Sequence, residues 1–364
     1  MENRAAEFFA GIGLVRMALE RAGWKVVFAN DISPAKYEMY RANFGSNEFS
    51  LGDIRHLKPQ DIPDVSLATA SFPCIDVSLA GNRKGLKGKH SSAYWEFHRL
   101  MEGMGKRRPR NVLLENVVGL LSSDNGGDLR QIVLSLNTLG YRCDLLLLDA
   151  ADFVPQSRPR LFVVGRQGSW GSGRPPCDEA RPPQVTRFIK QNSDLQWGIS
   201  ELPSLPRRRT RLEDLVERMD AADPSWWDKM RKMHLFRQIS PRHKDLLRTL
   251  VAGDTFSYAT VYKRVRPQGC RAEIRADGVA GCLRTPVGGS SKQFLIEAGR
   301  GEWRIRNMTA REYARLQGVP DSFTINVPYT KALHGFGDAV CVPVIEWVLN
   351  NGIPGTWSRA ALAV

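Results

Sequence analysis

The sequence predicts an α/β protein: a Rossmann-like, mostly parallel sheet with helices on both faces, plus a smaller second domain. Two observations favour this fold class. Short apolar runs alternate with helical patterns through the first half of the chain, and the alternation is lost between about Trp170 and Gly301. Alternating strands and helices are typical of parallel sheets, because each connecting helix covers one face of the sheet.

The elements of the predicted sheet follow in order along the chain. The strands are AAEFF (5–9), KVVFAN (25–30), SLATAS (66–71), NVLLEN (111–116), RCDLLLLDA (142–150) and RLFVVG (160–165). The helices between them are GLVRMALERAG (13–23), PAKYEMYRANFG (34–45) and DLRQIVLSLNTLG (128–140). Pro34 near a helix start, and Gly23 and Gly45 at helix ends, are the expected boundary residues.

A break in composition follows the last strand. The stretch GSWGSGRPPCDEARPP (168–183) is rich in glycine and proline and predicts a linker or surface loop. Basic clusters come next, in RRRTR (207–211), WWDKMRKMH (226–234) and YKRVRPQG (262–269). Helical patterns return in TAREYARLQG (309–318) and AVCVPVIEWVLNNG (339–352). We therefore predict one domain in residues 1–170, a separate, smaller and basic domain in 171–301, and a segment 302–364 that returns to the first domain.

Charge and cysteine content narrow the class of protein. The 364 residues carry a formal net charge of +14, which predicts a polyanionic partner, with a surplus of charge for solubility as the alternative. The six cysteines form no CxxC pair and no zinc-ligand spacing with the histidines, so we expect reduced thiols and no metal. No stretch approaches the roughly 20 apolar residues of a membrane span. We therefore expect a soluble intracellular protein.

The stretch EFFAGIGLVRMALE predicts a ligand site at the end of the first strand. Gly11 and Gly13 allow a sharp strand-to-helix turn that brings a ligand close to the helix N-terminus, although a tight turn without a ligand has the same pattern. Asp31 ends the second strand, where an acid binds ribose hydroxyls, and Asp53 in GDI is placed to accept from an adenine amino group. No phosphate-binding lysine accompanies these residues. The pattern favours a nucleoside without phosphates, such as S-adenosylmethionine, with Phe9 stacked against it.

Cys74 directly follows Pro73, just past the predicted strand SLATAS. Ligands of parallel sheets bind at the carboxyl ends of the strands. A buried structural cysteine is the alternative, but a polar loop after proline favours a thiolate nucleophile. The loop that follows contains Ser78, Arg83 and Lys84 among several glycines, a composition suited to contacting phosphate and closing over a nucleotide.

A carboxylate and two arginines mark the ends of two further strands. Glu115 follows four apolar residues in NVLLEN, and an acid on a buried strand is costly unless it is paired or functional. Arg158 and Arg160 lie in QSRPR at the start of the last strand, where phosphate binding or a surface salt bridge is the alternative to a catalytic role.

The ordered set FAGIG, GDI, PC, ENV, QSRPR, a variable stretch, RNMTAREYARLQGVPD and GFGDAV resembles the DNA cytosine 5-methyltransferase family. The resemblance implies that Cys74 attacks carbon 6 of cytosine, that Glu115 contacts ring nitrogen 3 and the exocyclic amine, and that Arg160, with Arg158, holds the activated base. It also implies an S-adenosylmethionine site lined by Phe9, Ala10, Gly11, Gly13, Asp31, Ile32, Asp53, Ile54 and Asp338.

The chain departs from the family pattern at a few positions. Ile75 follows the nucleophile where glutamine is usual, Leu14 replaces a glycine, and Asp338 replaces the usual asparagine. Cys282 precedes Leu283 where Thr-Leu is common. The nucleophile and the acid are intact, so we expect an active enzyme.

The resemblance implies methylation of carbon 5 of cytosine within a specific duplex DNA sequence, through base flipping and a covalent Cys74 adduct. The basic region 171–301 is expected to read the sequence, with Arg207, Arg208 and Arg209 contacting DNA. We expect a monomer in the cytoplasm, prokaryotic or phage-encoded and nucleoid-associated, within a restriction-modification system that includes a cognate endonuclease. The alternatives are a tRNA cytosine 5-methyltransferase, a catalytically silent DNA-binding module and, less favoured, a thiol redox protein.

Overall fold

The chain packs into two compact units. The computed structural model describes residues 3–73, 92–168, 176–266, 269–285 and 291–353. Unit 1 comprises Met1–Asp149, Pro159–Leu205 and Val342–Val364, and unit 2 comprises Ala150–Arg158 and Pro206–Cys341. The packing boundaries thus lie after Leu205 and Cys341, whereas composition places them after residues 170 and 301. The assignment of a function to each segment stays a prediction.

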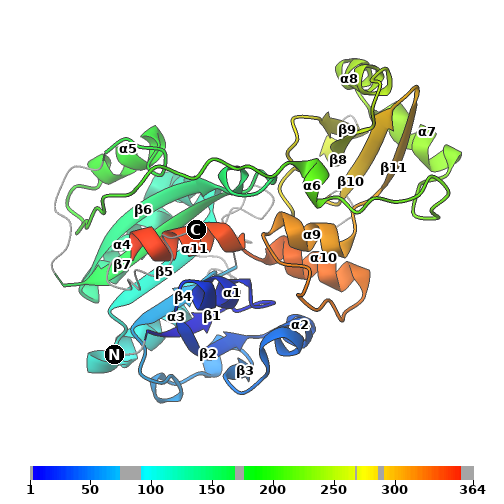
Figure 1. Cartoon of the computed structure of the whole chain (residues 1–364). Helices are drawn as coiled ribbons and strands as arrows, with labels where there is room; N and C mark the ends of the chain where they lie inside the picture. The colour runs from blue at the N-terminus through cyan, green and yellow to red at the C-terminus, as the bar shows by residue number, and fades with distance from the viewer. Residues whose placement is uncertain (1–2, 74–91, 169–175, 267–268, 286–290, 354–364) are drawn as a thin grey trace. The chain divides into compact units, whose positions relative to one another are not determined.

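Unit 1 is built on a seven-stranded sheet of order β3-β2-β1-β4-β5-β7-β6 (Figure 1). Strands β1 to β5 pair in parallel, and β7 runs antiparallel to both of its neighbours. The strands are β1 (Arg4–Phe8), β2 (Lys25–Asp31), β3 (Phe49–Leu51), β4 (Leu67–Ala70), β5 (Asn111–Val117), β6 (Tyr141–Asp149) and β7 (Pro159–Gln167). The prediction of a mostly parallel sheet is confirmed.

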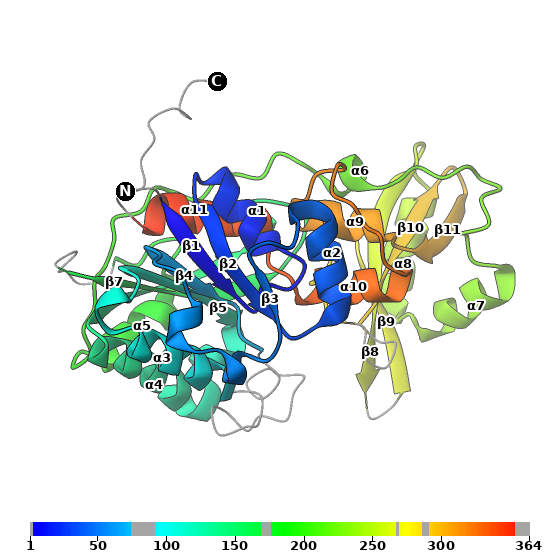
Figure 2. The ribbon, with the colours of Figure 1, turned by 90° about the horizontal axis from the view of Figure 1, so that it is seen from below.

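Helices cover both faces of this sheet. They are α1 (Leu14–Arg21), α2 (Pro34–Phe44), α3 (Ser92–Gly103), α4 (Gly127–Thr138), α5 (Pro183–Gln191) and α11 (Val342–Gly352). In Figure 2, α1 and α11 lie on one face, and α3 and α4 lie on the other. The core on the second face joins Phe8 of β1 to Phe97 of α3, whose rings meet edge-on with centroids 5.3 Å apart. Helices on both faces leave the strand ends as the accessible edge.

Short 3₁₀ turns connect the regular elements of unit 1. They are η1 (Ile54–His56), η2 (Pro59–Asp61), η4 (Gly105–Arg107), η5 (Val118–Leu121) and η6 (Ser123–Gly126). A further turn, η7 (Ala150–Asp152), begins the segment of unit 2 that interrupts unit 1.

Unit 2 contains a four-stranded antiparallel sheet of order β11-β10-β8-β9 (Figure 1). Its strands are β8 (Ser257–Arg266), β9 (Gly269–Arg275), β10 (Gln293–Gly299) and β11 (Glu302–Asn307), and its helices are α6 (Leu212–Leu215), α7 (Lys229–Gln238), α8 (Pro241–Val251), α9 (Ala310–Leu316) and α10 (Tyr329–Asp338). Phe294, Ile296 and Ala298 of β10 belong to a core cluster that includes Leu235 of α7 and Leu247 of α8. The alternate residues of β10 therefore face away from these two helices.

One apolar stretch in the described residues, Tyr329–Gly352, is long enough by composition to cross a membrane, with a mean hydropathy of 1.4. It comprises α10 and α11, and 67% of its apolar window is buried inside the structure. Such burial is usual for the core helices of globular proteins, so its length alone is weak evidence for a membrane span.

Candidate active site

The turn between β1 and α1 contains three residues with positive φ, a conformation that most residues other than glycine avoid. Gly11 and Gly13 have φ of 58° and 86°, in the left-handed region that favours glycine. Phe9, which is not a glycine, has φ of 58°, and such conformations cluster at ligand sites. A Cβ on Gly13 would lie 2.4 Å from the ring of Phe44, so glycine lets α1 begin against α2. Ala10, between these residues, is buried.

Asp31 at the end of β2 is fixed by two backbone donors. Its Oδ2 accepts from the N–H of Gly11 at 2.8 Å, and its Oδ1 accepts from the N–H of Ser33 at 2.8 Å. Each carboxylate oxygen keeps a second lone pair for a ligand hydroxyl. Ile32 follows with 63% of its surface exposed, an apolar face at the same strand end. An oriented acid, a glycine turn and an exposed apolar side chain fit the ribose and base of a nucleoside.

Asp53 is held by Arg55, for which the sequence predicts no role. It precedes η1, and its carboxylate accepts from Arg55 through the backbone N–H at 2.9 Å and from the guanidinium Nη2 at 2.6 Å. The hydrogen bonds from Arg55 lower the pKa of Asp53 to about 2, so the carboxylate is ionised near neutral pH. Ile54, predicted beside it at the cofactor, has its side chain in the hydrophobic core of unit 1.

Glu7 caps the helix that follows the glycine turn. The cap residue of α1 is Gly13, which has no side chain, and Glu7 Oε1 instead accepts from the N–H of Arg16 in the first turn at 3.2 Å. Glu7 is completely buried and its Oε2 atom has no hydrogen-bond partner. This burial, only partly offset by Arg16, raises the pKa of Glu7 to about 8.

The pKa of Glu7 makes a prediction about stability and pH. Between its ordinary value of 4.5 and about 8 the folded state holds a proton that the unfolded state has lost. The free energy of unfolding should therefore fall as pH rises through this window, with a slope of up to about 1.4 kcal/mol per pH unit from this group. Glu7→Gln should flatten the dependence in urea unfolding between pH 5 and 9. Glu38→Gln, at an exposed ion pair with Arg41, is the control, and parallel curves for wild type and Glu7→Gln would contradict the prediction.

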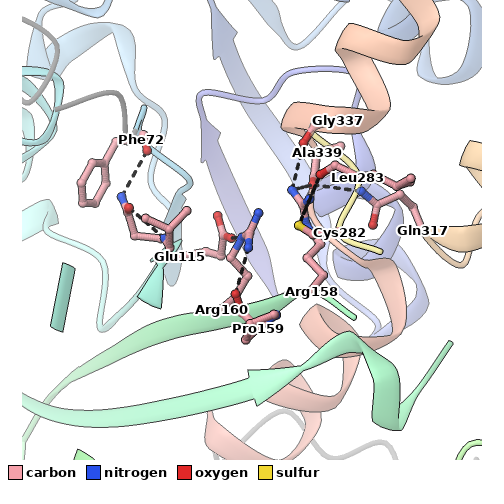
Figure 3. A network of polar contacts seen from close by, with 12 residues as sticks. Phe72, Glu115, Arg158, Pro159, Arg160, Cys282, Leu283, Gln317, Gly337 and Ala339 are labelled. Carbon is pink, nitrogen blue, oxygen red and sulfur yellow. Dashed lines mark hydrogen bonds and ion pairs between the residues drawn. The ribbon is translucent and has the colours of Figure 1, made fainter. Parts of the chain in front are cut away.

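Glu115 and Arg160 form an ion pair between the antiparallel strands β5 and β7 (Figure 3). Arg160 Nε lies 2.9 Å from Glu115 Oε1, and the two side chains are only 16% and 10% exposed. Arg160 also donates from Nη1 to the carbonyl of Pro159 at 2.8 Å. The fold thus brings the predicted catalytic acid and arginine together. The positive charge of Arg160 compensates the burial of the Glu115 carboxylate near the end of β5.

Asn116 ties the end of β5 to the end of β4. Its Nδ2 donates to the carbonyl of Phe72 at 3.2 Å, and its Oδ1 accepts from the N–H of Val117 at 2.9 Å. The side chains that surround this strand end are Phe72, Leu114, Glu115, Asn116, Leu120, Ile132, Leu161 and Val163. Cys74 follows Phe72 by two residues in the sequence. Cys74, Ser78, Arg83 and Lys84 themselves lie outside the described residues.

Arg158 joins two segments of unit 2 (Figure 3). It is 3% exposed, and its Nη1 donates to the carbonyl of Leu283 at 2.6 Å and lies 3.6 Å from Cys282 Sγ. Its Nη2 donates to the carbonyls of Gly337 at 3.1 Å and Ala339 at 2.5 Å. These contacts describe a guanidinium that positions backbone, two residues away in sequence from the arginine that pairs with Glu115.

Two buried glutamines extend this network. Gln156 is fully buried, donates to the carbonyl of Leu316 at 2.7 Å and accepts from the N–H of Leu283 at 3.2 Å. Gln317, also fully buried, donates to the carbonyl of Phe336 at 2.7 Å. Sequence reasoning missed both. A signal was present, because each glutamine lies within a motif, QSRPR or RLQG, that carries more prominent residues.

The remaining predicted residues of unit 2 have separate surroundings. Asp338, at the end of α10, accepts a hydrogen bond from Thr285. Arg208 is half-buried and donates to the carbonyls of Ala151 and Thr210, whereas Arg207 and Arg209 are exposed. Asp338 belongs to unit 2 and the other predicted cofactor residues to unit 1, so their joint role stays a prediction. No group of three or more histidine, cysteine or acidic side chains suited to a metal occurs in the part of the chain that the structure describes.

The sheet order, with one antiparallel strand next to the edge and an oriented acid after β2, defines an S-adenosylmethionine-dependent methyltransferase fold. A model of the C-5 cytosine-specific DNA methylase family matches residues 3–353, and the chain belongs to this family. It is an enzyme that methylates carbon 5 of cytosine in DNA, with S-adenosylmethionine as the methyl donor.

Individual relatives match over nearly their whole lengths. The chain is 28% identical over 355 residues to the Type II methyltransferase M.HaeII of Haemophilus aegyptius, covering 97% of this chain and 93% of the relative. It is 26% identical over 349 residues to M.HhaI of Haemophilus parahaemolyticus, covering 96% and 93%. Among solved structures, the Dnmt2 methyltransferase of S. pombe superposes with a TM-score of 0.61 at 20% identity, over 95% of this chain and 97% of that one. A likeness at that identity shows the fold alone.

Proposed function

We propose that this chain methylates one cytosine within a specific sequence of duplex DNA, as the modification enzyme of a restriction-modification system. The observation that carries the proposal is the Glu115–Arg160 ion pair near the end of β5. At the same strand end, Asn116 donates to the carbonyl of Phe72, two residues before Cys74 in the sequence. The relatives named Type II methyltransferases support the restriction-modification context. A cognate endonuclease, a monomeric state and a cytoplasmic, nucleoid-associated location in a prokaryote or phage are part of the proposal.

The proposed chemistry begins with a nucleophile. Carbon 5 of cytosine is a weak nucleophile, and addition of the Cys74 thiolate to carbon 6 moves electron density towards carbon 5. Glu115 stabilises the charge that develops at nitrogen 3, a task that a dry, preorganised pocket performs well. S-adenosylmethionine, when bound, supplies the methyl group. Loss of the proton from carbon 5 and of the thiolate from carbon 6 then restores the aromatic ring.

Arg160 and Arg158 serve different parts of this scheme. Arg160 fixes the orientation of the Glu115 carboxylate and keeps positive charge beside the pocket. Arg158 acts as a positioning residue, because its guanidinium contacts Cys282, Leu283, Gly337 and Ala339 within unit 2. The target base lies inside a stacked duplex, so it must be flipped out at a cost of a few kcal/mol.

The proposed DNA contacts lie in two regions. Ser78, Arg83 and Lys84 are assigned to the loop after Cys74, and the region 171–301 is assigned to sequence recognition. Exposed Arg207 and Arg209 are suited to phosphate contacts, whereas Arg208 has its donors on backbone carbonyls. The net charge of +14 supports a polyanionic substrate.

The test of this function is methyl transfer from labelled S-adenosylmethionine to duplex DNA and, in parallel, to tRNA. We expect incorporation into duplex DNA, with bisulfite sequencing showing one cytosine modified in one recurring sequence. Incorporation into tRNA alone would establish the RNA alternative, which is not favoured, because the family match concerns DNA methylases and the Dnmt2 likeness shows only the fold. Binding without incorporation into either would establish a silent module.

The proposed cofactor role of Asp53 has its own test. Asp53→Ala should weaken S-adenosylmethionine binding by about 1–3 kcal/mol, because a ligand donor loses its partner. Isothermal titration calorimetry measures this directly. Asp64→Ala, which removes an exposed carboxylate paired with Arg107, is the matched control and should leave the affinity unchanged. Unaltered affinity in a folded Asp53→Ala enzyme would remove Asp53 from the site.

A further inference from the structure

Strands β8 and β9 continue as a two-stranded ribbon beyond the rest of the unit 2 sheet. Strand β8 pairs with β10 from Ser257 to Tyr262, whereas its pairing with β9 runs on to Arg266. The extension therefore comprises residues 263–266 and 269–272, and Figure 2 shows the two strands reaching past β10 and β11. The major groove of B-DNA is wide enough to admit a two-stranded ribbon of this kind.

At the start of this ribbon, three side chains on one face form a connected network. Tyr262 lies opposite Glu273, and its hydroxyl is 2.5 Å from Glu273 Oε2. Arg264, on the same face of β8 as Tyr262, places Nε 3.2 Å from the same carboxylate oxygen and donates from Nη2 to the Tyr262 hydroxyl at 3.2 Å. Its guanidinium also lies over the Tyr262 ring at 5.1 Å.

This network fixes the Nε–Nη2 edge of the Arg264 guanidinium and leaves the Nη1–Nη2 edge available to a ligand. The Nε and one Nη2 hydrogen are engaged, and no hydrogen bond joins Nη1 to another described residue. The side chain of Arg264 remains 49% exposed. The terminal Nη1–Nη2 edge is the one that donates two parallel hydrogen bonds to O6 and N7 of guanine.

A second arginine lies directly opposite the first. The antiparallel register pairs Arg264 with Arg271, which is exposed. Like charges directly opposite each other in an antiparallel pair destabilise the sheet. A polyanion between or beside the two guanidinium groups would remove this repulsion, so the pair indicates an anionic ligand at the ribbon.

Three other described arginines of unit 2 lack this combination. Arg275 is bound by its Nε to Asp277 at the turn after β9, and Arg248 is paired with its helix neighbour Asp245. Arg306 is fully buried against Glu312. Arg264 is instead held from behind on a strand that extends out of the sheet.

We propose that Arg264 is a specificity-determining residue that reads a guanine in the major groove through its Nη1–Nη2 edge, that Tyr262 and Glu273 position it, and that Arg271 contacts a neighbouring phosphate. The proposal rests on the proposed function, that the enzyme methylates a specific sequence of duplex DNA. It adds which side chain contributes one base of that specificity.

The test compares Arg264→Gln with wild type on a library of duplexes varied at each position around the target cytosine. Methyl transfer should persist, and discrimination in favour of guanine at one position should fall by about 5- to 150-fold, the range for one bidentate contact. Arg248→Gln is the matched control and should keep the wild-type preference. If wild type methylates no duplex DNA, the proposed function fails; if it does and Arg264→Gln keeps full discrimination at every position, only this proposal fails.

The salt dependence of DNA binding distinguishes a phosphate contact from a base contact. Arg271→Gln should weaken binding equally for all sequences and make the slope of log affinity against log salt concentration shallower by about 1. The same uniform behaviour in Arg264→Gln would overturn the assignment of Arg264 to a base. The positioning role predicts that Tyr262→Phe and Glu273→Gln lower discrimination at that same position while thermal unfolding stays at the wild-type temperature. A loss of stability with unchanged discrimination would show that the network only braces the sheet.

Discussion

Cys74→Ser should lower methyl transfer to background while leaving the folded enzyme able to bind S-adenosylmethionine and DNA. A serine hydroxyl is far less ionised than a thiol near neutral pH, so it makes a poor nucleophile for carbon 6. The thiol is not assigned to the cofactor pocket, so calorimetric affinity for S-adenosylmethionine should equal that of wild type. Full methylation by Cys74→Ser would reject the covalent mechanism.

Trapping with 5-fluorocytosine identifies the reacting thiol. Release of the enzyme requires loss of a proton from carbon 5, and fluorine at that carbon cannot leave as a cation. Duplex DNA with 5-fluorocytosine at the target should therefore hold the protein after one methyl transfer, in an adduct that survives denaturing electrophoresis. Mass spectrometry should map the adduct to Cys74. Cys177→Ser, which removes an exposed free cysteine, is the matched control and should be trapped like wild type; an adduct on any other cysteine would show a different nucleophile.

The sheet of unit 1 was predictable because its strands are buried on both faces and are therefore continuously apolar. The predicted strand 111–116 and helix 34–45 match β5 (Asn111–Val117) and α2 (Pro34–Phe44) to within one residue. The direction of β7 was not predictable, since an apolar run has the same composition in a parallel and an antiparallel pair. Helix α3 was missed because it directly follows the glycine-rich stretch after Cys74.

Unit 2 was much less predictable than unit 1. Strand β8, with sequence SYATVYKRVR, carries Tyr262 and Arg264 on the face away from α7 and α8, so it lacks a continuous apolar pattern. Tyr258 and Tyr262 of this strand have cross-strand partners, Glu297 on β10 and Glu273 on β9, that only the register supplies. The packing boundary after Leu205 differs from the composition boundary at residue 170, because the glycine- and proline-rich stretch leads into α5, which packs in the core of unit 1.

In the candidate site, too, some residues could be predicted from sequence motifs and others could not. Glu115 and Arg160 were found from motifs at strand ends, but their 2.9 Å contact depends on the antiparallel pairing of β5 with β7. Glu7 and Arg55 were not found, because an acid in a strand and a basic residue after GDI carry no signal until the helix start and the 3₁₀ turn place their partners. Sequence motifs thus indicate the residues to which a chemical role is proposed, whereas the partners of those residues become visible only in the fold.

Glu115→Gln should retain DNA and cofactor binding but lower the rate of methyl transfer by about 10²- to 10³-fold. Glutamine keeps the size and one acceptor oxygen, so the hydrogen bond from Arg160 Nε, now 2.9 Å long, can persist. The amide cannot pass a proton to nitrogen 3, so the negative charge that thiolate addition places on the ring is no longer neutralised there. Removal of one such preorganised group typically costs about 2.7–4 kcal/mol of transition-state stabilisation.

Single-turnover methylation with saturating DNA and S-adenosylmethionine measures this effect without contributions from binding or product release. Formation of the 5-fluorocytosine adduct should slow by a similar factor, because thiolate addition at carbon 6 is the step that places charge on the ring. Asp194→Asn, which neutralises an exposed carboxylate 2.6 Å from Arg130, is the matched control and should react at the wild-type rate. Adduct formation at the wild-type rate by Glu115→Gln would show that Glu115 acts after carbon 6 addition. A methylation rate equal to wild type would show that the carboxylate only anchors Arg160.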